Sequence, residues 1–258
     1  MEIKIGDSIT INVNVPDIYE DGLKAATIET GKTIKIIPET INAVLAPLRQ
    51  WIARREYNVE ETKKLLEIKL ENINAESIVT PDPYVAVPAF QAISYSMDSE
   101  DLRNLYANLL ATSMINETKW KVHPSFVEII KQITPDEAKL LKTLSEKGDI
   151  YPSIGIILKD NNSHISHVYH FTNLANNVCE NPNGIFSYLD NLERLKLIEI
   201  PFGESLNDES YQPFEDDPYV KELMSETIHE NYKWEIENKY FRLTQYGKDF
   251  IEVCVKDD

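Results

Sequence analysis

The sequence predicts a mainly α fold, in which an N-terminal helical domain precedes a smaller α+β domain. Two observations lead to this class. Helix-start patterns and apolar residues at helical spacing recur up to about residue 147, and short strand-like runs alternate with helical ones after Gly148. We therefore divide the chain into an arm (residues 1–16), a helical domain (17–147) and an α+β domain (148–258).

The arm alternates apolar and polar side chains, which predicts a strand or a hairpin that turns at Gly6 and Asp7. Its apolar side holds Ile9, Ile11, Val13 and Val15. A two-stranded unit is weakly stable alone, so we expect it to pack on a helix or to pair with another chain. A homodimer is compatible with this arm.

Capping patterns locate the helices of the second segment. Asp98 or Ser99 begins a helix that runs to about residue 113, and Thr134 with Glu137 forms a capping box around Pro135 at the start of another. The first of these helices directs a regular apolar stripe inward, consisting of Leu102, Leu105, Tyr106 and Leu109. These features predict a helical bundle.

The third segment predicts a different order of elements. A strand at 154–158 precedes a polar loop at 159–170, and helices follow at about 172–180 and 185–196. Strands at 198–202 and 240–243 then flank a long connection, and Thr244 caps a last helix. This order, with the L-T-x-x-G-x-x-F pattern at 243–250, resembles a winged-helix domain.

The connection between these two strands would be the wing, and it is unusually long and acidic. Residues 203–230 carry nine acidic side chains and one lysine, and we extend the insertion to residues 203–236. We expect it to be solvated. Its densest run of charge is Glu215, Asp216 and Asp217, which we take as the candidate surface for a protein partner.

Net charge argues against nucleic acid as a partner. The chain has a formal charge of −17, and residues 134–258 hold 24 acidic and 12 basic side chains. Such a surface repels phosphate backbones. The helix at 185–196 also exposes mixed charges: Asp190, Asn191, Glu193, Arg194 and Lys196. A protein-binding winged helix is therefore favoured, and a DNA-binding transcriptional regulator is the alternative.

Catalytic and metal-binding patterns are weak. His164, His167 and His170 could supply imidazole ligands, but on one strand His167 would point away from the other two, so a polar loop is favoured over a metal site. Cys179 lies beside Glu180, which disfavours a nucleophilic thiolate, and Cys254 is expected in the core. Glycine-rich phosphate loops and hydrolase motifs are absent, so we expect no cofactor and no enzyme activity.

One segment could touch a membrane surface. Arg49, Arg54 and Arg55 surround Trp51 at the end of the proline-broken stretch 34–55, a combination that suits an anionic bilayer surface. The alternative is a core helix that ends in cations. No apolar run is long enough to span a bilayer, no apolar leader begins the chain, and only two cysteines are present. We expect a cytoplasmic protein.

The motifs YANLLATSM (106–114) and HPSFVEIIKQITPDEAKLL (123–141) carry a family resemblance, supported by the patterns at 81–103 and 19–32. Over about residues 17–145 the chain resembles the abortive infection alpha family. The resemblance implies a bacterial protein linked to antiphage defence, and it transfers no active-site residues. We therefore expect a noncatalytic phage-resistance protein that contacts a phage or host protein, with a DNA-binding regulator or a membrane-surface effector as alternatives.

Overall fold

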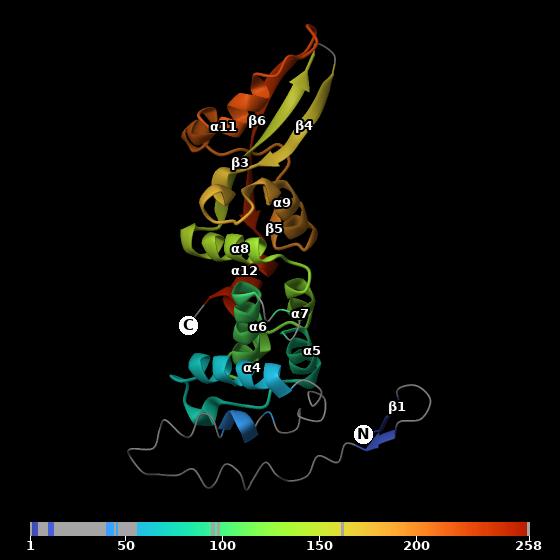
Figure 1. Cartoon of the computed structure of the whole chain (residues 1–258), viewed down its shortest axis with the longest axis vertical. Helices are drawn as coiled ribbons and strands as arrows, with labels where there is room; N and C mark the ends of the chain where they lie inside the picture. Colours follow the sequence, from blue (N-terminus) through green and yellow to red (C-terminus); the bar gives the residue numbers. More distant parts are fainter. Residues whose placement is uncertain are drawn as a thin grey trace.

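The computed structural model shows a mixed α+β protein, with helices at one end and an antiparallel sheet at the other (Figure 1). A mainly α fold is correct for the first half, but the sheet is larger than the sequence indicates. The structure describes residues 2–4, 10–12, 40–43, 45, 56–93, 96, 99–160 and 163–256.

The predicted N-terminal hairpin is confirmed. Strand β1 (Glu2–Lys4) pairs antiparallel with β2 (Thr10–Asn12), and Ile3 lies opposite Ile11. The predicted turn at Gly6 and Asp7 lies outside the described residues.

The predicted membrane-contacting segment is only partly described. Ile41 and Leu45 are buried in the hydrophobic core, which favours the core-helix interpretation for that part of the segment. In the described part of the chain, no helix combines the length and the apolarity needed to cross a bilayer. The residues proposed to contact lipid all lie outside the described ranges: Arg49, Trp51, Arg54 and Arg55.

Helix α6 (Glu100–Ser113) is the centre of the helical layer, and short 3-10 turns, η2 (Ala75–Ser77) and η3 (Lys119–Lys121), lie before and after it in the chain. It contacts α4 (Glu56–Lys69), α5 (Pro83–Ile93), α7 (Ser125–Ile130) and α8 (Pro135–Lys147).

The capping and burial predictions for this layer are confirmed. The Ser99 hydroxyl accepts a hydrogen bond from the Leu102 N–H, and Thr134 with Glu137 forms the capping box that begins α8. Leu105, Tyr106 and Leu109 are buried, and Leu102 packs half-buried against them. Local sequence signals therefore locate α6 and α8 correctly.

The sheet consists of β3 (Ile150–Lys159), β4 (His164–Phe171), β5 (Ile198–Glu199) and β6 (Lys233–Leu243). Its order is β4-β3-β6-β5, and every neighbouring pair is antiparallel. Strands β3 and β6 pair over their longest stretch, from Ile150 opposite Arg242 to Lys159 opposite Lys233.

The predicted polar loop at 159–170 is wrong, because most of it is strand β4. The side chains of β4 alternate between an exposed face, with Ile165, His167 and Tyr169, and an inner face, with Val168 and the half-buried His170. Because apolar residues lie on the exposed face and a histidine on the inner face, the sequence lacks the apolar–polar alternation that indicates a strand, and two register shifts against β3 add to the irregularity. Strand β6, the other neighbour of β3, begins at Lys233, seven residues before the predicted start at 240, so the insertion ends before residue 236.

Between β4 and β5 the chain forms 3-10 turns, η4 (Asn173–Asn177) and η5 (Pro182–Gly184), and then α9 (Ile185–Arg194). The α9 helix matches the prediction for 185–196. The helix predicted at 172–180 is only the short turn η4. At its start the Leu174 N–H donates a hydrogen bond to the Thr172 hydroxyl.

The acidic insertion is folded: eight of its nine acids are exposed, as expected of a solvated segment, but its chain forms short helices. It forms η6 (Asp208–Tyr211), α10 (Gln212–Glu215) and α11 (Pro218–Met224), which lie beside the sheet in Figure 1. Apolar residues spaced among the acids anchor it, and the Tyr211 hydroxyl donates to the Lys239 carbonyl of β6 at 2.9 Å. The buried anchors are Tyr211, Phe214, Val220 and Leu223.

The last helical segment returns to the helical layer. Helix α12 (Gln245–Phe250) continues into a π-helical turn, η7 (Ile251–Val255), which packs on α6 near the C-terminal end of the chain in Figure 1. The end of a helix leaves carbonyl groups without partners. Asn108 Nδ2 donates to the Cys254 carbonyl at 3.0 Å, and Thr112 Oγ1 donates to the Val253 carbonyl at 3.3 Å.

Gly247 explains the glycine of the L-T-x-x-G-x-x-F pattern. Thr244 caps α12 by accepting a hydrogen bond from the Gly247 N–H at 2.9 Å, and the same turn lies against the backbone that precedes β5. A Cβ atom on Gly247 would lie 2.0 Å from the Leu197 carbonyl oxygen. Only glycine permits this approach of α12 to the sheet.

Gly247→Ala is expected to lower the free energy of unfolding by about 2–4 kcal/mol, because the methyl group forces α12 away from the Leu197 backbone. Urea denaturation followed by circular dichroism measures the loss. Gly203→Ala is the matched control: Gly203 has φ +73° but no atom within 4 Å of an added Cβ, so its cost is about 1 kcal/mol. Equal losses in the two variants would contradict the steric explanation.

Candidate functional site

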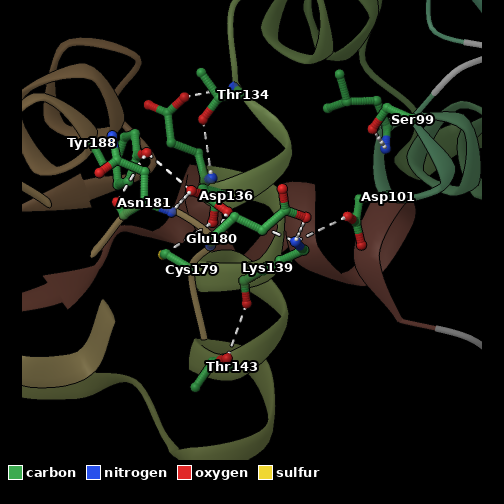
Figure 2. A network of polar contacts seen from close by, with 12 residues as sticks. Ser99, Asp101, Thr134, Asp136, Lys139, Thr143, Cys179, Glu180, Asn181 and Tyr188 are labelled. Atoms are coloured by element: carbon green, nitrogen blue, oxygen red, sulfur yellow. Dashed lines mark hydrogen bonds and ion pairs between the residues drawn. The ribbon is translucent and has the colours of Figure 1, made fainter. Parts of the chain in front are cut away.

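A buried carboxylate joins the helical layer to the segment before α9 (Figure 2). Asp136 lies in the first turn of α8, and its side chain is 8% exposed. It accepts hydrogen bonds from the backbone N–H groups of Glu180 (2.8 Å) and Asn181 (2.9 Å) and from the Tyr188 hydroxyl (3.0 Å). These bonds tie together residues that are more than 40 positions apart.

The surroundings of Asp136 keep it ionised. Burial alone would raise the pKa of its carboxyl, but the two N–H groups, the Tyr188 hydroxyl and the Lys139 ammonium 3.7 Å away together lower that pKa below its ordinary value. Burial, followed by the contact with Asp136, raises the pKa of Tyr188 to about 12. The carboxylate is therefore an acceptor and the hydroxyl a donor throughout the physiological range.

Lys139 extends the junction to α6. Its ammonium lies 2.8 Å from the Glu180 carboxylate and 3.8 Å from that of Asp101 (Figure 2). The hydrogen bond from Lys139 to Glu180 is the main cause that raises the pKa of Lys139. The polar groups of this junction thus satisfy one another, which suits a structural connection.

Neither cysteine is prepared for nucleophilic attack. Burial is the largest cause that raises the pKa of the Cys179 thiol to about 11, and the neighbouring Asp136 carboxylate adds to the effect. Cys254 is fully buried in η7, and burial raises the pKa of its thiol well above the ordinary value. A nucleophilic cysteine needs the opposite environment.

Two polar residues of α9 face the helical layer. Asn191 Nδ2 donates to the Gln132 carbonyl (2.8 Å) and to Glu137 (2.7 Å), and the Arg194 guanidinium donates to the Gln132 side chain (3.1 Å). Both residues belong to the predicted exposed surface that could read DNA. Asn191 is half-buried, whereas Arg194 is exposed as predicted, with its guanidinium held by Gln132 and Asn191.

The three histidines do not converge. His167 is exposed and its ring lies edge-on to Trp234, with centroids 5.3 Å apart, whereas His170 is half-buried. The backbone of His164 belongs to β4, and its side chain lies outside the described features. Among the described residues, no cluster of three or more histidine, cysteine or acidic side chains could hold a metal ion.

The predicted acidic contact surface is divided by the fold. Glu215 and Asp216 are exposed, and Asp216 pairs with Lys221 at 2.6 Å. Asp217 is buried and caps α11, accepting hydrogen bonds from the N–H groups of Tyr219 and Val220. The prediction that Asp217 contacts a partner is therefore corrected: its carboxylate caps the start of α11. An Asp followed by Pro is a common start of a helix.

A cleft that the sequence did not indicate lies where β4, α9 and α11 meet. Its volume is about 320 Å³. Its lining combines aromatic rings, imidazoles and a carboxylate: His167, Val168, Tyr169, His170, Phe186, Asp190 and Tyr219. Three separate segments supply these side chains, so only the aromatic content of β4 could have pointed to it.

The fold defines an α+β protein in which a helical layer is completed by its own C-terminal segment and carries a sheet with a folded acidic insertion. A sequence model of the family described as abortive infection alpha matches residues 54–254, and the chain belongs to that family. No curated protein and no solved structure matches the chain.

The extent of the family match corrects the resemblance seen in the sequence. The match begins at residue 54 and continues to residue 254, whereas the resemblance was assigned to about residues 17–145. The sheet, the acidic insertion and all of η7 except Val255 therefore lie within the family match, together with the helical layer.

Asp136→Asn is expected to lower the free energy of unfolding by about 2–4 kcal/mol at pH 7, because an amide supplies one acceptor oxygen and turns an N–H₂ group toward N–H donors. The pKa of Asp136 is depressed in the folded state, so its contribution is present above the ordinary value of 3.8 and is lost as the pH falls through the folded-state pKa. Urea unfolding from pH 7 to pH 3 measures both effects.

Asp101→Asn is the control for this measurement. Asp101 is partly exposed and lies 3.8 Å from Lys139, so its neutralisation is expected to cost less than about 0.5 kcal/mol. A difference between wild type and Asp136→Asn that stays constant down to pH 3 would contradict the ionised state of Asp136.

Both thiols are expected to react slowly with Ellman's reagent in the folded protein at pH 7.5. With a pKa of about 11, Cys179 is a thiolate in roughly one molecule in a thousand or fewer at that pH. The rate should rise steeply toward pH 10, and both thiols should react at once in guanidinium chloride. Rapid labelling of one thiol in the folded protein at pH 7.5 would contradict the assigned environment.

Proposed function

We propose that this chain is a noncatalytic abortive-infection protein that acts in antiphage defence by binding a protein partner through α10 and α11. Membership of the abortive infection alpha family supports the defence role. The observation that supports this surface is the folded state of the acidic insertion, which holds its exposed carboxylates on anchored helices.

The insertion is built to present charge at fixed positions. Phe214 and Val220 are buried beneath α10 and α11, and the ring centroids of Phe214 and Phe171 of β4 lie 6.1 Å apart. The Asp217 cap fixes the start of α11. Glu215 and Asp216 project from between these anchors, so binding a partner costs little conformational entropy there.

The charge of this surface indicates the chemistry of the partner. Residues 203–230 carry nine acids and one lysine, and that lysine already pairs with Asp216. A basic protein surface complements such a field, and long-range attraction accelerates the encounter. A nucleic-acid backbone would be repelled.

We also propose that the second half of the chain is a modified winged helix. The order β3-β6-β5 together with α8 and α9 supports this assignment, with β4 added at the edge and the β5–β6 wing opened by the acidic insertion. The internal contacts of Asn191 and Arg194 favour protein binding over DNA reading by α9. We place the protein in the cytoplasm, where its two free thiols stay reduced.

The double variant Glu215→Gln/Asp216→Asn is expected to weaken defence. Loss of two charges at a contact typically weakens binding by about tenfold or more, so phage plating on cells that express the variant should rise toward the level of cells without the protein. Asp217 is left intact, because its replacement would disturb α11. Expression level and thermal midpoint should match those of the wild type.

The matched control is Glu71→Gln/Glu146→Gln, which removes the same charge from two exposed positions in the helical layer. It should leave plating unchanged. A photoreactive residue at position 215, compared with one at position 71, identifies the partner by cross-linking during infection. Full protection by the Glu215→Gln/Asp216→Asn variant, without a position-specific cross-link, would overturn the proposed surface.

A further inference from the structure

The cleft between β4, α9 and α11 has aromatic walls. Tyr169 of β4 is 66% exposed, and Tyr219 of α11 is 37% exposed. The ring centroid of Tyr219 lies 5.8 Å from that of Phe186 on α9 and 5.0 Å from that of Phe171 on β4. Tyr169 belongs to β4, whereas Phe186 and Tyr219 belong to α9 and α11. The packing of these two helices on the sheet therefore sets the positions of the rings.

Two polar groups in the cleft lack partners in the described part of the chain. The Nδ1 atom of His170 is buried and makes no hydrogen bond there. The Asp190 carboxylate is exposed at the cleft and makes no hydrogen bond or ion pair within the described ranges. Because the Nδ1 atom has almost no accessible surface, His170 contributes the exposed part of its imidazole to the cleft wall, and Asp190 is the unpartnered polar group that a ligand can reach.

The electrostatic surroundings select the sign of that ligand. Asp190, Glu193 and Glu237 all act on His170, against the single cation Lys239. Burial, assisted by Lys239, nevertheless lowers the pKa of His170, so its imidazole is neutral near pH 7 and does not repel a cation. The cleft therefore offers a carboxylate, an uncharged imidazole and aromatic rings, inside a half of the chain that carries twice as many acids as bases.

We propose that this cleft binds the protonated amine or guanidine group of an organic cation. The Asp190 carboxylate neutralises the charge, the uncharged His170 imidazole adds no repulsion, and the rings of Tyr169, Phe186 and Tyr219 surround the remaining surface of the cation. Aromatic rings with a nearby carboxylate are the usual receptor for such groups. A volume of about 320 Å³ lies at the small end of ligand sites and suits a head group on a short chain.

The cation could belong to a free amine or to a lysine or arginine side chain of a protein. The second source rests on the proposed function, because Tyr219 belongs to the same α11 helix that would contact a basic partner. The recognition chemistry is the same in both cases. The two sources are separated by the probes used to test the site.

The test is calorimetric titration of the full chain with agmatine, with spermidine and with the blocked peptide acetyl-Gly-Arg-Gly-amide. We expect saturable binding of at least one cation with a dissociation constant between about 10 μM and 1 mM. Agmatine or spermidine binding without peptide binding assigns the site to a free amine. Peptide binding of equal or greater strength assigns it to a partner side chain.

Asp190→Asn is expected to weaken binding by about tenfold or more, and Tyr169→Ala by about threefold to tenfold. Neither should change the urea midpoint much, because the Asp190 carboxylate makes no hydrogen bond or ion pair with the described residues and Tyr169 is largely exposed. Asp208→Asn is the matched control: it removes one exposed carboxylate outside the cleft and should leave the affinity within twofold. The ¹⁵N resonance of His170 Nδ1 should shift on titration.

Absence of saturable binding for all three cations would overturn the proposal. An equal loss of affinity in Asp208→Asn and Asp190→Asn would also overturn it, because it would indicate general attraction by an acidic surface. Adenosine monophosphate serves as the anionic probe, and binding of equal strength would contradict the selection for cations. Intact cation binding in the Glu215→Gln/Asp216→Asn variant, whatever its effect on phage plating, separates this site from the proposed partner surface.

Discussion

The contact between the C-terminal helical segment and α6 is the constraint on which the rest of the structure depends. Asn108 and Thr112 supply the donors for the carbonyls that end η7, and the buried side chains of η7 complete the core beneath α6. The other end of this segment is fixed to the sheet, because the Thr244 cap and the close approach of Gly247 bind α12 to the backbone before β5. The segment formed by α12 and η7 therefore connects the helical layer to the sheet, in addition to the Asp136 junction.

Helices that begin with strong local signals could be predicted from the sequence, and the edge of the sheet could not. Ser99 and Thr134 cap their helices through bonds within three residues, so the chemistry is visible in a short window. Strand β4 depends on pairing with β3, and it carries Ile165 and Tyr169 on its exposed face and His170 on its inner face, so its sequence shows no apolar–polar alternation. The folded structure of the acidic insertion could not be predicted for a related reason: its buried apolar residues, such as Phe214, are few and are dispersed among charged residues.

The candidate sites follow the same division. The weak nucleophilicity predicted for Cys179 has the right direction but another cause: burial and then Asp136, 43 residues away in the chain, raise the pKa of its thiol. The role of Asp136 was not predictable, because the N–H groups it binds lie 44 and 45 residues away. The cleft is also assembled from distant segments. Asp190 and Tyr219 become neighbours only after α9 and α11 have packed on the sheet.

The position of η7 also determines when the molecule can finish folding. A ribosome delivers the helical layer first, but the face of α6 that receives η7 stays open until residue 254 has left the exit tunnel. Roughly 140 residues separate α6 from η7. Because synthesis proceeds at about 5–20 residues per second, the apolar face of α6 stays exposed for about 7–30 s. Chaperone capture during that interval, and removal of interrupted chains by proteases, are the cellular consequences of closing the helical layer with a segment that is synthesised long after it.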